Sequence, residues 1–284
     1  MHKRIFESPI KTALAITSLA ALVIFLITAN WNWVSSNVFP NTRLGLYDKG
    51  FWENYLVEMH GMVLELALFG VLIVWLNSKR TEKIQINEYK ELLTDYATLD
   101  FPEANLKKLT GLKRLNSYKV FEFSVRDMSL KDMTVNGLVF TNGSLIGMKV
   151  TNGTLKNSEF SSVQMRSSNF ANTQVKTCRF LDCNLYKTNF ANANCKGVSF
   201  EKSNLERSDF SGANLQSAIL KNVDLRETKF HDANLNRCSL VEAYNVSTEE
   251  LAKAKSLDYI AVSDSLLDEL IKLRPDMKYQ KRRK

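Results

Sequence analysis

Large apolar side chains recur at every fifth position between residues 130 and 240. The stretch SNLERSDFSGANLQSAILKNVDL, which begins at Ser203, shows the pattern clearly. An α-helix repeats its apolar face near 3.6 residues and a β-strand repeats at 2, so neither element explains a period of five. Two positions before each large residue, the side chains are small or short from Gly143 to Cys238, apart from Met148. The pattern predicts a chain that turns a corner every five residues and stacks on itself.

Phenylalanine indicates the length of one circuit. Its positions in the repeat form two series with a spacing of twenty residues, Phe140, Phe160, Phe180 and Phe200 in one and Phe170, Phe190, Phe210 and Phe230 in the other. Four sides of five residues give a circuit of twenty, so the two series should occupy opposite walls of a four-sided coil. We expect these eight phenylalanines to form the structural core of a packed tube rather than a pore.

The repeats resemble a known family. The stretches FSGANLQSAILKNVDL, NFANANC and NFANTQV resemble the pentapeptide-repeat family, whose signature is A-(N/D)-L-x-x. The resemblance covers residues 125–245 and implies a right-handed quadrilateral β-helix, with coils ~4.8 Å apart as in hydrogen-bonded strands. The segment from Gly61 to Val125 also looks like the front end of bacterial membrane-anchored members of this family. The expected fold is therefore mainly β, with the pentapeptide-repeat solenoid at residues 119–245.

Helices are expected to cover both ends of this solenoid, because an open coil exposes unpaired backbone groups. Residues 78–118 should form juxtamembrane and capping helices, with a capping box of Asp100 and Glu103 around Pro102. The last of these helices should place Leu106, Leu109 and Leu112 on one face. Residues 246–284 should form a C-terminal helical cap and a basic tail. There, Ser247 and Glu250 form a second capping box, and another helix should follow Ser263 or Asp264.

Two apolar runs near the N-terminus predict a pair of transmembrane helices, at about 12–30 and 56–76, within a region 1–77 that includes a short external loop. A cleaved signal peptide is the less favoured alternative for the first run. Lysine and arginine precede the first run and follow the second, while Trp31, Trp33, Trp52 and Tyr55 lie between them. This distribution places both termini in the cytoplasm of a multi-pass protein, which we assign to the bacterial inner (plasma) membrane.

The second apolar run contains an ionisable residue, Glu65, just beyond His60. These two are the candidate functional residues inside the membrane, because ionisable groups there are rare and costly. The alternative, which we favour, is a structural role in which Glu65 is protonated or bonded to Thr17, Ser18 or another Glu65 in an oligomer. Ile86, Tyr89, Leu93 and Tyr96 follow as a short helical seam that could pair with a second copy, so a homodimer is left open.

The net charge of +8 changes this picture little, because five Lys or Arg residues lie in the last seven positions. Residues 120–245 hold fifteen Lys or Arg and twelve Asp or Glu, a balance of +3. Lys156, Lys176 and Lys196 nevertheless share one column, and with the outward Tyr186 they are the candidate interaction surface. Such a column suits acidic lipid, nucleic acid or an acidic partner. The simpler interpretation, a solvated face, is favoured.

Residues with catalytic potential are few. The three histidines are His2, His60 and His231, and the four cysteines show no zinc spacing. We expect the cysteines to be reduced and buried. The glycines of TNGSLIGMKVTNGTL suggest Asn-Gly corners rather than a phosphate-binding loop. We therefore expect a non-enzyme with no catalytic residues, no cofactor and no metal.

The function predicted from these observations is a membrane-anchored, cytoplasm-facing scaffold for protein–protein interaction. Its expected partners are the lipid bilayer and an unidentified cytoplasmic protein, and nucleic acid is not expected. One alternative is a membrane effector or sensor whose transmembrane pair responds to the repeat domain. A less favoured alternative is a DNA mimic that inhibits gyrase, since the family members of that kind are strongly acidic and this repeat region is not.

Overall fold

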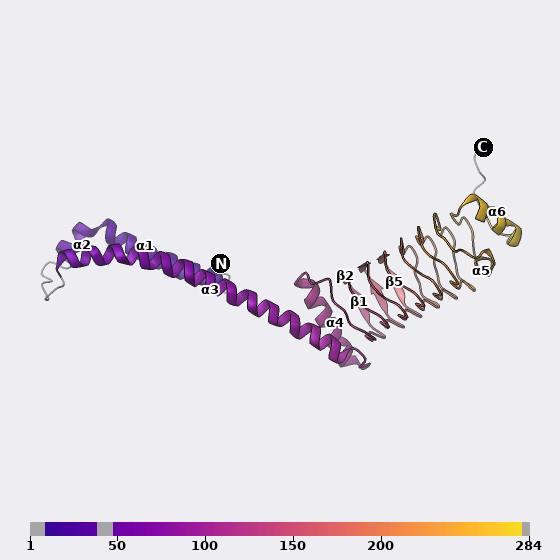
Figure 1. The fold of residues 1–284 in the computed structure, drawn as a ribbon, viewed down its shortest axis with the longest axis horizontal. Helices are drawn as coiled ribbons and strands as arrows, with labels where there is room; N and C mark the ends of the chain where they lie inside the picture. The colour runs from indigo at the N-terminus through magenta and orange to yellow at the C-terminus, as the bar shows by residue number, and fades with distance from the viewer. Residues whose placement is uncertain (1–8, 39–47, 280–284) are drawn as a thin grey trace. The chain divides into compact units, whose positions relative to one another are not determined.

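The computed structural model describes residues 9–38 and 48–279 and shows two compact units, which divide between Gln85 and Ile86. Figure 1 shows the helices of the first unit and the stacked coils of the second. The basic residues expected at the two extreme ends, such as Lys3, Arg4 and Arg282, lie outside the described residues.

The first unit contains helix α1 (Pro9–Ala29), the short helix α2 (Trp31–Asn37) and most of helix α3 (Lys49–Tyr96). Two helical segments are long and apolar enough to cross a membrane, Lys11–Ala29 and a window within α3. They overlap the two predicted spans, but the first ends at Ala29, α3 extends well beyond the expected 56–76, and α2 was not anticipated. Residues 86–96 of α3 belong to the second unit.

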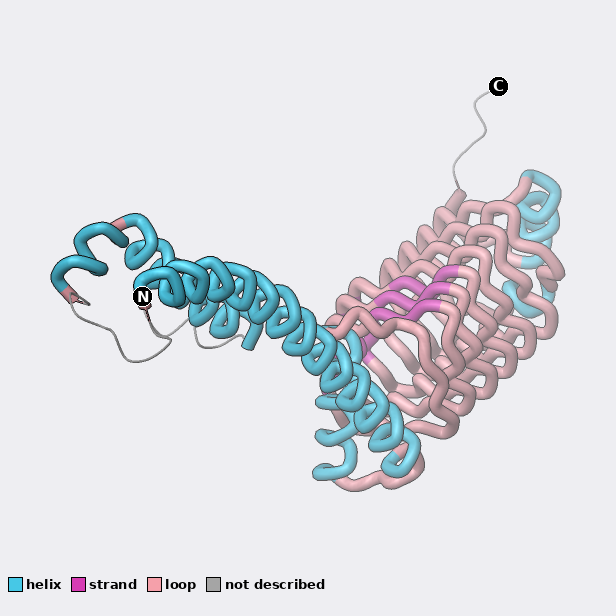
Figure 2. Tube along the Cα trace, turned by 60° about the vertical axis from the view of Figure 1, so that its left-hand side comes forward, coloured by secondary structure: helices cyan, strands magenta, loops and turns pink. Residues whose placement is uncertain are grey.

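The second unit is a stack of four-sided coils in which each residue pairs with the one twenty positions later. The strands are β1 (Thr134–Asn136), β2 (Val139–Thr141), β3 (Thr154–Lys156), β4 (Glu159–Ser161), β5 (Gln174–Lys176) and β6 (Arg179–Leu181). They form two parallel sheets, in the orders β1-β3-β5 and β2-β4-β6. Figure 2 shows these short strands within the stack. Isolated parallel bridges continue the same ladder along the other sides, from Ser124 onward. The β-helix is thus present, and its right-handedness stays a prediction.

The corners repeat as regularly as the walls. The large apolar residue at every fifth position, which points inward, is here called the central residue. Two positions after each central residue, from Asp127 to Glu242, the backbone has a positive φ between 50° and 72°. Most of these corner residues are not glycine, although this conformation disfavours a Cβ atom. The cost is offset because most corner N–H groups join the ladder between coils. For example, Asn142 N donates to Ser161 O at 3.0 Å, and Asn152 N donates to Ala171 O at 3.2 Å.

The family signature has a direct physical basis in the residue before each central position. There, the side-chain oxygen of Asn or Asp accepts the backbone N–H two residues later, as in Asn184 with Tyr186 at 3.2 Å and Asn189 with Ala191 at 2.8 Å. This bond spans the inward-pointing central residue and fixes the corner that follows it. Asp209 and Asp224 make the same bond in later coils.

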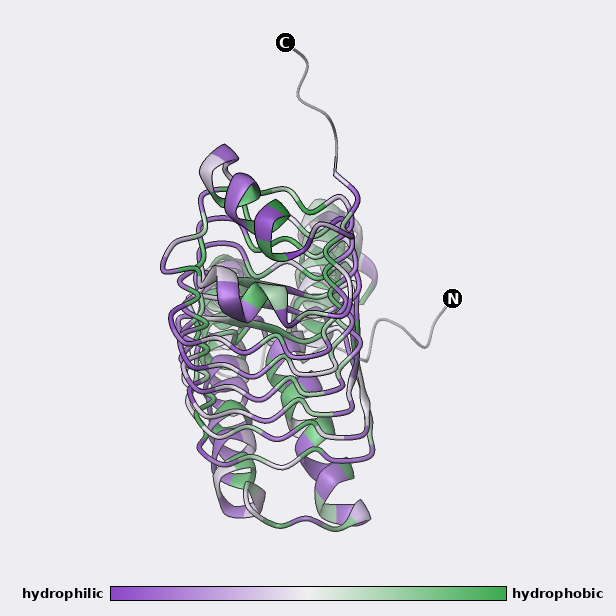
Figure 3. Cartoon of the chain, turned by 90° about the vertical axis from the view of Figure 1, so that its right-hand side faces the viewer, coloured by the Kyte–Doolittle hydropathy of each residue, from purple (hydrophilic) through white to green (hydrophobic). Residues whose placement is uncertain are grey.

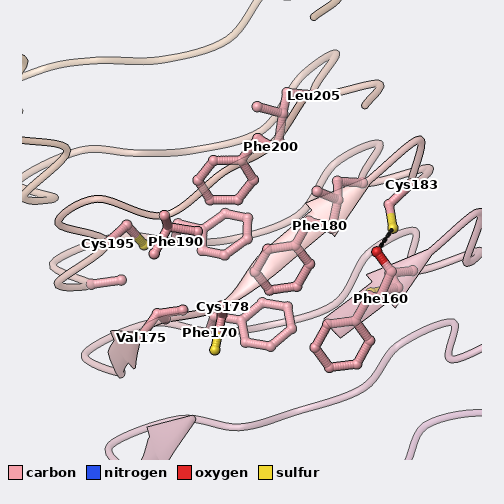
Figure 4. Packing of buried hydrophobic residues seen from close by; sticks show 14 of the residues in the cluster. Phe160, Phe170, Val175, Cys178, Phe180, Cys183, Phe190, Cys195, Phe200 and Leu205 are labelled. Atoms are coloured by element: carbon pink, nitrogen blue, oxygen red, sulfur yellow. Dashed lines mark hydrogen bonds between the residues drawn. The ribbon is translucent and has the colours of Figure 1, made fainter. Parts of the chain in front are cut away.

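Phenylalanine rings fill the interior as two stacked columns. Within each column neighbouring rings are nearly parallel, as in Phe190 and Phe210, whose centroids lie 4.8 Å apart at 1°. Between the columns the rings meet edge to face, as in Phe190 and Phe200 at 5.4 Å and 81°. Both geometries are favourable for aromatic pairs. All eight repeat phenylalanines are at most 2% exposed, and five of them appear in Figure 4.

The position two residues before each central residue, here called the slot, holds a small side chain in most repeats and lies inside the coil. Several of these side chains can donate a hydrogen bond to a buried backbone carbonyl. Hydroxyl and thiol groups here donate to the carbonyl of a central residue in the preceding coil, as Ser208 does to Leu185 at 2.8 Å and Cys183 to Phe160 at 3.3 Å (Figure 4). Gly143 and Gly153 occupy the same slot, so the expectation that they form the corners was wrong. A Cβ at either would lie 2.4 Å from a carbonyl oxygen of the preceding coil, and Asn142 and Asn152 take the positive φ instead.

The N-terminal end of the coils is covered by the last turns of α3 and by helix α4 (Pro102–Ser117). Leu93 and Leu112 lie in the same buried cluster as the repeat core. The expected seam of α3 therefore packs within its own chain, with Ile86 and Tyr89 against the same cluster. Leu106 is 60% exposed, and α4 buries Leu109, Leu112 and Leu115 instead. The expected Asp100–Glu103 capping box is also absent, because the N-cap residue is Phe101.

The C-terminal end is covered by helices α5 (Thr248–Ala252) and α6 (Asp264–Leu273). Figure 3 shows both at this end, with hydrophobic and hydrophilic residues on different sides of α6. Ser247 caps α5 by accepting the N–H of Glu250 at 3.1 Å, which confirms half of the predicted capping box. The ladder continues to the bridge between Ser239 and Ala261, so the predicted repeat end at residue 245 falls short.

Candidate functional site

One wall of the coil carries the candidate lysine column. This lysine wall consists of residues 134–137, 154–157, 174–177, 194–197, 214–217 and 234–237, which share one side of successive coils. Lys156 and Lys176 are direct partners in the β3–β5 register, and Lys196 follows one coil later. Two ammonium groups at the ~4.8 Å strand spacing repel each other by about 1 kcal/mol in water. The structure thus brings the three predicted lysines together.

The column is electrically unbalanced. The six segments of the lysine wall contain no Asp or Glu, and Arg237 adds a further positive charge. Among the described residues, none of the three lysines takes part in an ion pair. Lys176 and Lys196 are exposed, and Lys156 is half-buried. The wall therefore presents an uncompensated line of positive charge to solvent.

A ladder of side-chain amides runs beside the lysines and was not recognised in the sequence. Asn194 Nδ2 donates to Gln174 Oε1 at 3.0 Å, Asn214 donates to Asn194 at 3.2 Å and Asn234 donates to Asn214 at 3.3 Å. Each amide is thereby held in one orientation. These amide residues recur every twenty positions in the sequence, and this spacing could have revealed the ladder. At the C-terminal end the wall closes on a polar hollow lined by Gln216, Asn234, Asn236, Lys255 and Ser256.

Tyr186 does not belong to this surface. It lies ten residues from Lys176, which is half a circuit, so it occupies the opposite wall. Arg207 Nη1 donates to the Tyr186 hydroxyl at 2.9 Å, and Lys187 Nζ lies 5.3 Å from the ring centroid. Arg207 also binds Glu227 through two nitrogens, at 2.8 and 3.2 Å, which lowers the pKa of the Glu227 carboxyl and raises that of Arg207. Unlike the lysine wall, this cluster satisfies its own charges.

His60 and Glu65, the intramembrane candidates, are not brought together. His60 lies on the partly buried side of α3, and its Nδ1 is 2.7 Å from the Leu56 carbonyl oxygen, one turn away. Glu65 is exposed, five residues further along the helix. Since each residue turns an α-helix by about 100°, the two side chains diverge by roughly 140°. They do not form a proton pathway with each other.

At the N-terminal cap, Lys108 and Lys131 were missed in the sequence, and Asp100 was given a different role. The fully buried Lys108 donates to the carbonyl oxygens of Ala97 at 3.2 Å and Leu99 at 2.6 Å. It thereby satisfies two backbone carbonyl groups in the segment that follows α3. Burial lowers the pKa of Lys108 to about 8. An ion pair with Lys131, together with a hydrogen bond from Asn105, lowers the pKa of Asp100 to about 2. We interpret this cluster as structural.

The four cysteines of the repeat region are buried, whereas His231, the histidine of this region, is on the surface. All four cysteines are free and buried, and burial raises the pKa of Cys178 to about 11 and that of Cys183 to about 12. His231 is exposed beside Asp232. In the part of the chain that the structure describes, no group of three His, Cys, Asp or Glu residues is arranged to hold a metal ion.

Comparisons with known proteins match the repeat region of the chain. The model of the pentapeptide repeat region matches residues 154–230 and 173–249. Among solved structures, the pentapeptide repeat protein Rfr23 from the cyanobacterium Cyanothece 51142 is 18% identical, with 43% of this chain and 95% of that chain covered and a TM-score of 0.32. A pentapeptide repeat protein from the Arabidopsis thaliana thylakoid lumen is 20% identical, with coverages of 44% and 86% and a TM-score of 0.35.

The full-length structure of QnrB1, a plasmid-mediated fluoroquinolone resistance protein, is 14% identical, with coverages of 55% and 98% and a TM-score of 0.19. No curated protein matches the chain. The period of five, the four-sided coils and the family match over residues 154–249 together show that the repeat region of this chain belongs to the pentapeptide-repeat family.

Proposed function

We propose that this chain is a membrane-anchored, cytoplasm-facing scaffold whose lysine wall binds an acidic surface of another protein. The observation that supports this most is the column of Lys156, Lys176 and Lys196, which has no ion-pair partner among the described residues and lies on a wall without acidic residues. The function proposed is non-enzymatic, since such a wall offers charge and hydrogen bonds at fixed positions rather than a nucleophile or a general base.

Rigidity favours binding at this wall. The backbone ladder sets the spacing of the lysines, and the amide ladder from Gln174 to Asn234 fixes the polar groups beside them. A surface that is already ordered loses less conformational entropy on binding than a flexible one does. Two coil steps, roughly 10 Å, separate the first lysine from the third. This matches the rise of about 10.5 Å over seven residues of a helix that carries acidic residues on one face.

A protein partner fits the wall better than nucleic acid does. The outward positions of the lysine wall hold Thr, Asn, Gln, Lys, Ser, Gly and Arg, so they offer no aromatic ring on which a base could stack. Three lysines would neutralise about three phosphates, which gives only weak and salt-sensitive binding. The wall also offers no exposed apolar side chain for insertion into a bilayer.

The membrane anchor in this proposal consists of α1 and the apolar part of α3. Both segments are long and apolar enough to span a bilayer. Trp31 Nε1 donates to Glu53 Oε1 at 3.0 Å, and Phe51, Trp52 and Tyr55 form an aromatic cluster at the same end of the pair, as expected for an interface. Lys79, Arg80 and Lys83 follow the second span. Their charge supports an orientation with both termini in the cytoplasm of a bacterial inner membrane.

Affinity capture from a membrane fraction tests the proposal. The full chain and a variant with Lys156→Glu, Lys176→Glu and Lys196→Glu would each be used as bait at two salt concentrations. A matched control carries Lys187→Glu, Lys202→Glu and Lys229→Glu, which makes the same charge change on the other three walls. A partner that is retained by the wild type and the control, and lost by the lysine-wall variant and at high salt, would support the proposal. Equal losses in both variants would contradict it.

One observation favours the effector alternative. Leu93 and Ala97, at the end of α3, lie in the buried cluster that continues into the repeats, while the same helix carries the apolar span. A change at the repeats could therefore act on α3 directly. Under this alternative Glu65→Gln should abolish the response while leaving partner capture unchanged. The gyrase-inhibitor alternative stays a prediction, which a supercoiling assay with the purified chain tests.

A further inference from the structure

We infer that two copies of this chain associate in the membrane through the face of α3 that carries Glu65. The inference rests on the membrane anchor proposed above, and it identifies a second copy of the chain as the occupant of that face. It goes beyond the scaffold function, because the lysine wall would bind its partner with or without this association.

The α1-facing side of α3 is defined by its partly buried residues. They recur at intervals of three and four along the span, as Leu56, His60, Val63, Ala67, Gly70 and Val74. A groove lined by Leu14 from α1 and by Ala67, Leu68, Val71, Leu72 and Trp75 from α3 runs along the edge of this contact. Glu65 is two residues from both Val63 and Ala67, so its side chain lies roughly 160° from each around the helix. Glu65 therefore points directly away from α1.

No partner satisfies Glu65 within the chain. Among the described residues it makes no hydrogen bond or ion pair, and its neighbours Leu64 and Leu66 are exposed as well. An acidic side chain near the middle of a membrane-spanning helix costs about 2.5–3.5 kcal/mol on insertion scales and normally faces a protein interior. The exposed position of Glu65 is therefore unfavourable for a single copy in lipid.

Gly61 provides an independent observation on the same face. It lies one helical turn before Glu65, and a Cβ at this position would meet nothing within 4 Å. A Cβ at Gly70, on the α1-facing side, would also meet nothing within 4 Å, so the fold of a single chain requires neither glycine, although glycine inside a helix costs about 1 kcal/mol relative to alanine. Small residues are enriched where membrane helices approach closely, because they allow the two backbones to come near each other. Gly61 supplies such an approach next to Glu65.

A second copy satisfies both features at once. A two-fold axis along the membrane normal makes the two α3 helices parallel and places each Glu65 at the same depth as its counterpart. The two Glu65 side chains then hydrogen-bond to each other across the axis. The glycines permit the close crossing that this bond needs. Every copy carries the same unsatisfied group on the same face, so this arrangement requires no other molecule.

Cysteine cross-linking of the full chain in native membranes tests the inference. Phe69→Cys places a thiol one turn after Glu65 on the same face and outside the groove shared with α1, and the matched control Leu64→Cys places one on an equally exposed position about 140° from Phe69 around the helix. The four native cysteines are buried in the repeats and should not react. Oxidation should give a disulfide-linked dimer with Phe69→Cys and little with Leu64→Cys.

Variants of the two key residues complete the test. Adding Glu65→Leu to the Phe69→Cys chain should lower the dimer association about 3- to 20-fold, the range expected for one hydrogen bond between membrane helices. Glu65→Gln, which can still pair across the axis, should retain most of the dimer, and Gly61→Leu should reduce it. A chain that fractionates with the membrane but shows no cross-link with Phe69→Cys, or an equal one with Leu64→Cys, would overturn the inference alone. A chain absent from the membrane fraction would overturn the proposed anchor as well.

Discussion

Replacing Phe190 with alanine tests the packing of the coil most directly. Phe190 is fully buried at the centre of the aromatic core. It stacks on Phe170 at 5.0 Å and on Phe210 at 4.8 Å, and it meets Phe180 and Phe200 edge to face at 6.2 and 5.4 Å. The substitution therefore removes four ring pairs and leaves a cavity that the fixed coil spacing cannot close.

The magnitude follows from these contacts. Large-to-small substitutions of buried Phe cost about 3–5 kcal/mol, and Phe190→Ala should lie at the upper end because all four ring pairs are lost. Phe230→Ala is the matched control, since Phe230 is also buried but pairs with only one ring among the described residues, Phe210 at 5.9 Å. We expect the two costs to differ by about 2 kcal/mol. For a domain of this size, Phe190→Ala should lower the Tm by about 8–20 °C.

Thiol accessibility during heating is a suitable assay. All four cysteines lie in the repeats and are buried, so their reaction with a thiol reagent reports on the unfolding of this unit even in the full chain. Equal Tm shifts for Phe190→Ala and Phe230→Ala would refute the reasoning, because the number of ring contacts would then have no energetic consequence. A smaller shift for Phe190→Ala would refute it more strongly.

Three further predictions concern single positions. Gly153→Ala should destabilise the repeats by about 2–3 kcal/mol in denaturant titrations, because its Cβ would lie 2.4 Å from the Met133 carbonyl oxygen. The control is Gly61→Ala, where a Cβ meets nothing within 4 Å, and it should leave the Tm of the repeats unchanged. Since the ion pair with Lys131 and the bond from Asn105 lower the pKa of Asp100 to about 2, the stability from Asp100 is present above about pH 4 and lost as the pH falls toward 2. After allowance for solvent exposure this amounts to about 1 kcal/mol, and the loss should be absent in Asp100→Asn, as measured by unfolding across this pH range. Finally, a thiol reagent at pH 8 should modify none of the four cysteines in the folded chain and all four in denaturant, because burial raises the pKa of each thiol. Rapid reaction of any thiol in the native state would contradict this burial.

The helical parts show where sequence patterns are least informative. The sequence indicated α4 and α6, but the α4 pattern selected Leu106, which is exposed, and Asp100 as a capping residue, which instead pairs with Lys131. The buried Lys108 could not have been recognised from its neighbours in the sequence. Its environment consists of the carbonyls of Ala97 and Leu99, which the chain brings back after a turn. Such contacts depend on how one helix docks on another, and local periodicity does not encode that choice.

The sequence by itself determined the coil, its circuit of twenty residues and the wall on which each side chain lies. In a solenoid each residue contacts the one a fixed number of positions later, so spacing in the sequence becomes position in space. That is why the columns of Phe and Lys could be assigned before the structure was known. Only the tertiary structure decided which side of α3 meets α1, how Glu65 is placed, which slot residues bond to the coil below, and how the two ends are capped. These features depend on contacts between elements that have no fixed register, and their geometry is set by packing rather than by spacing along the chain.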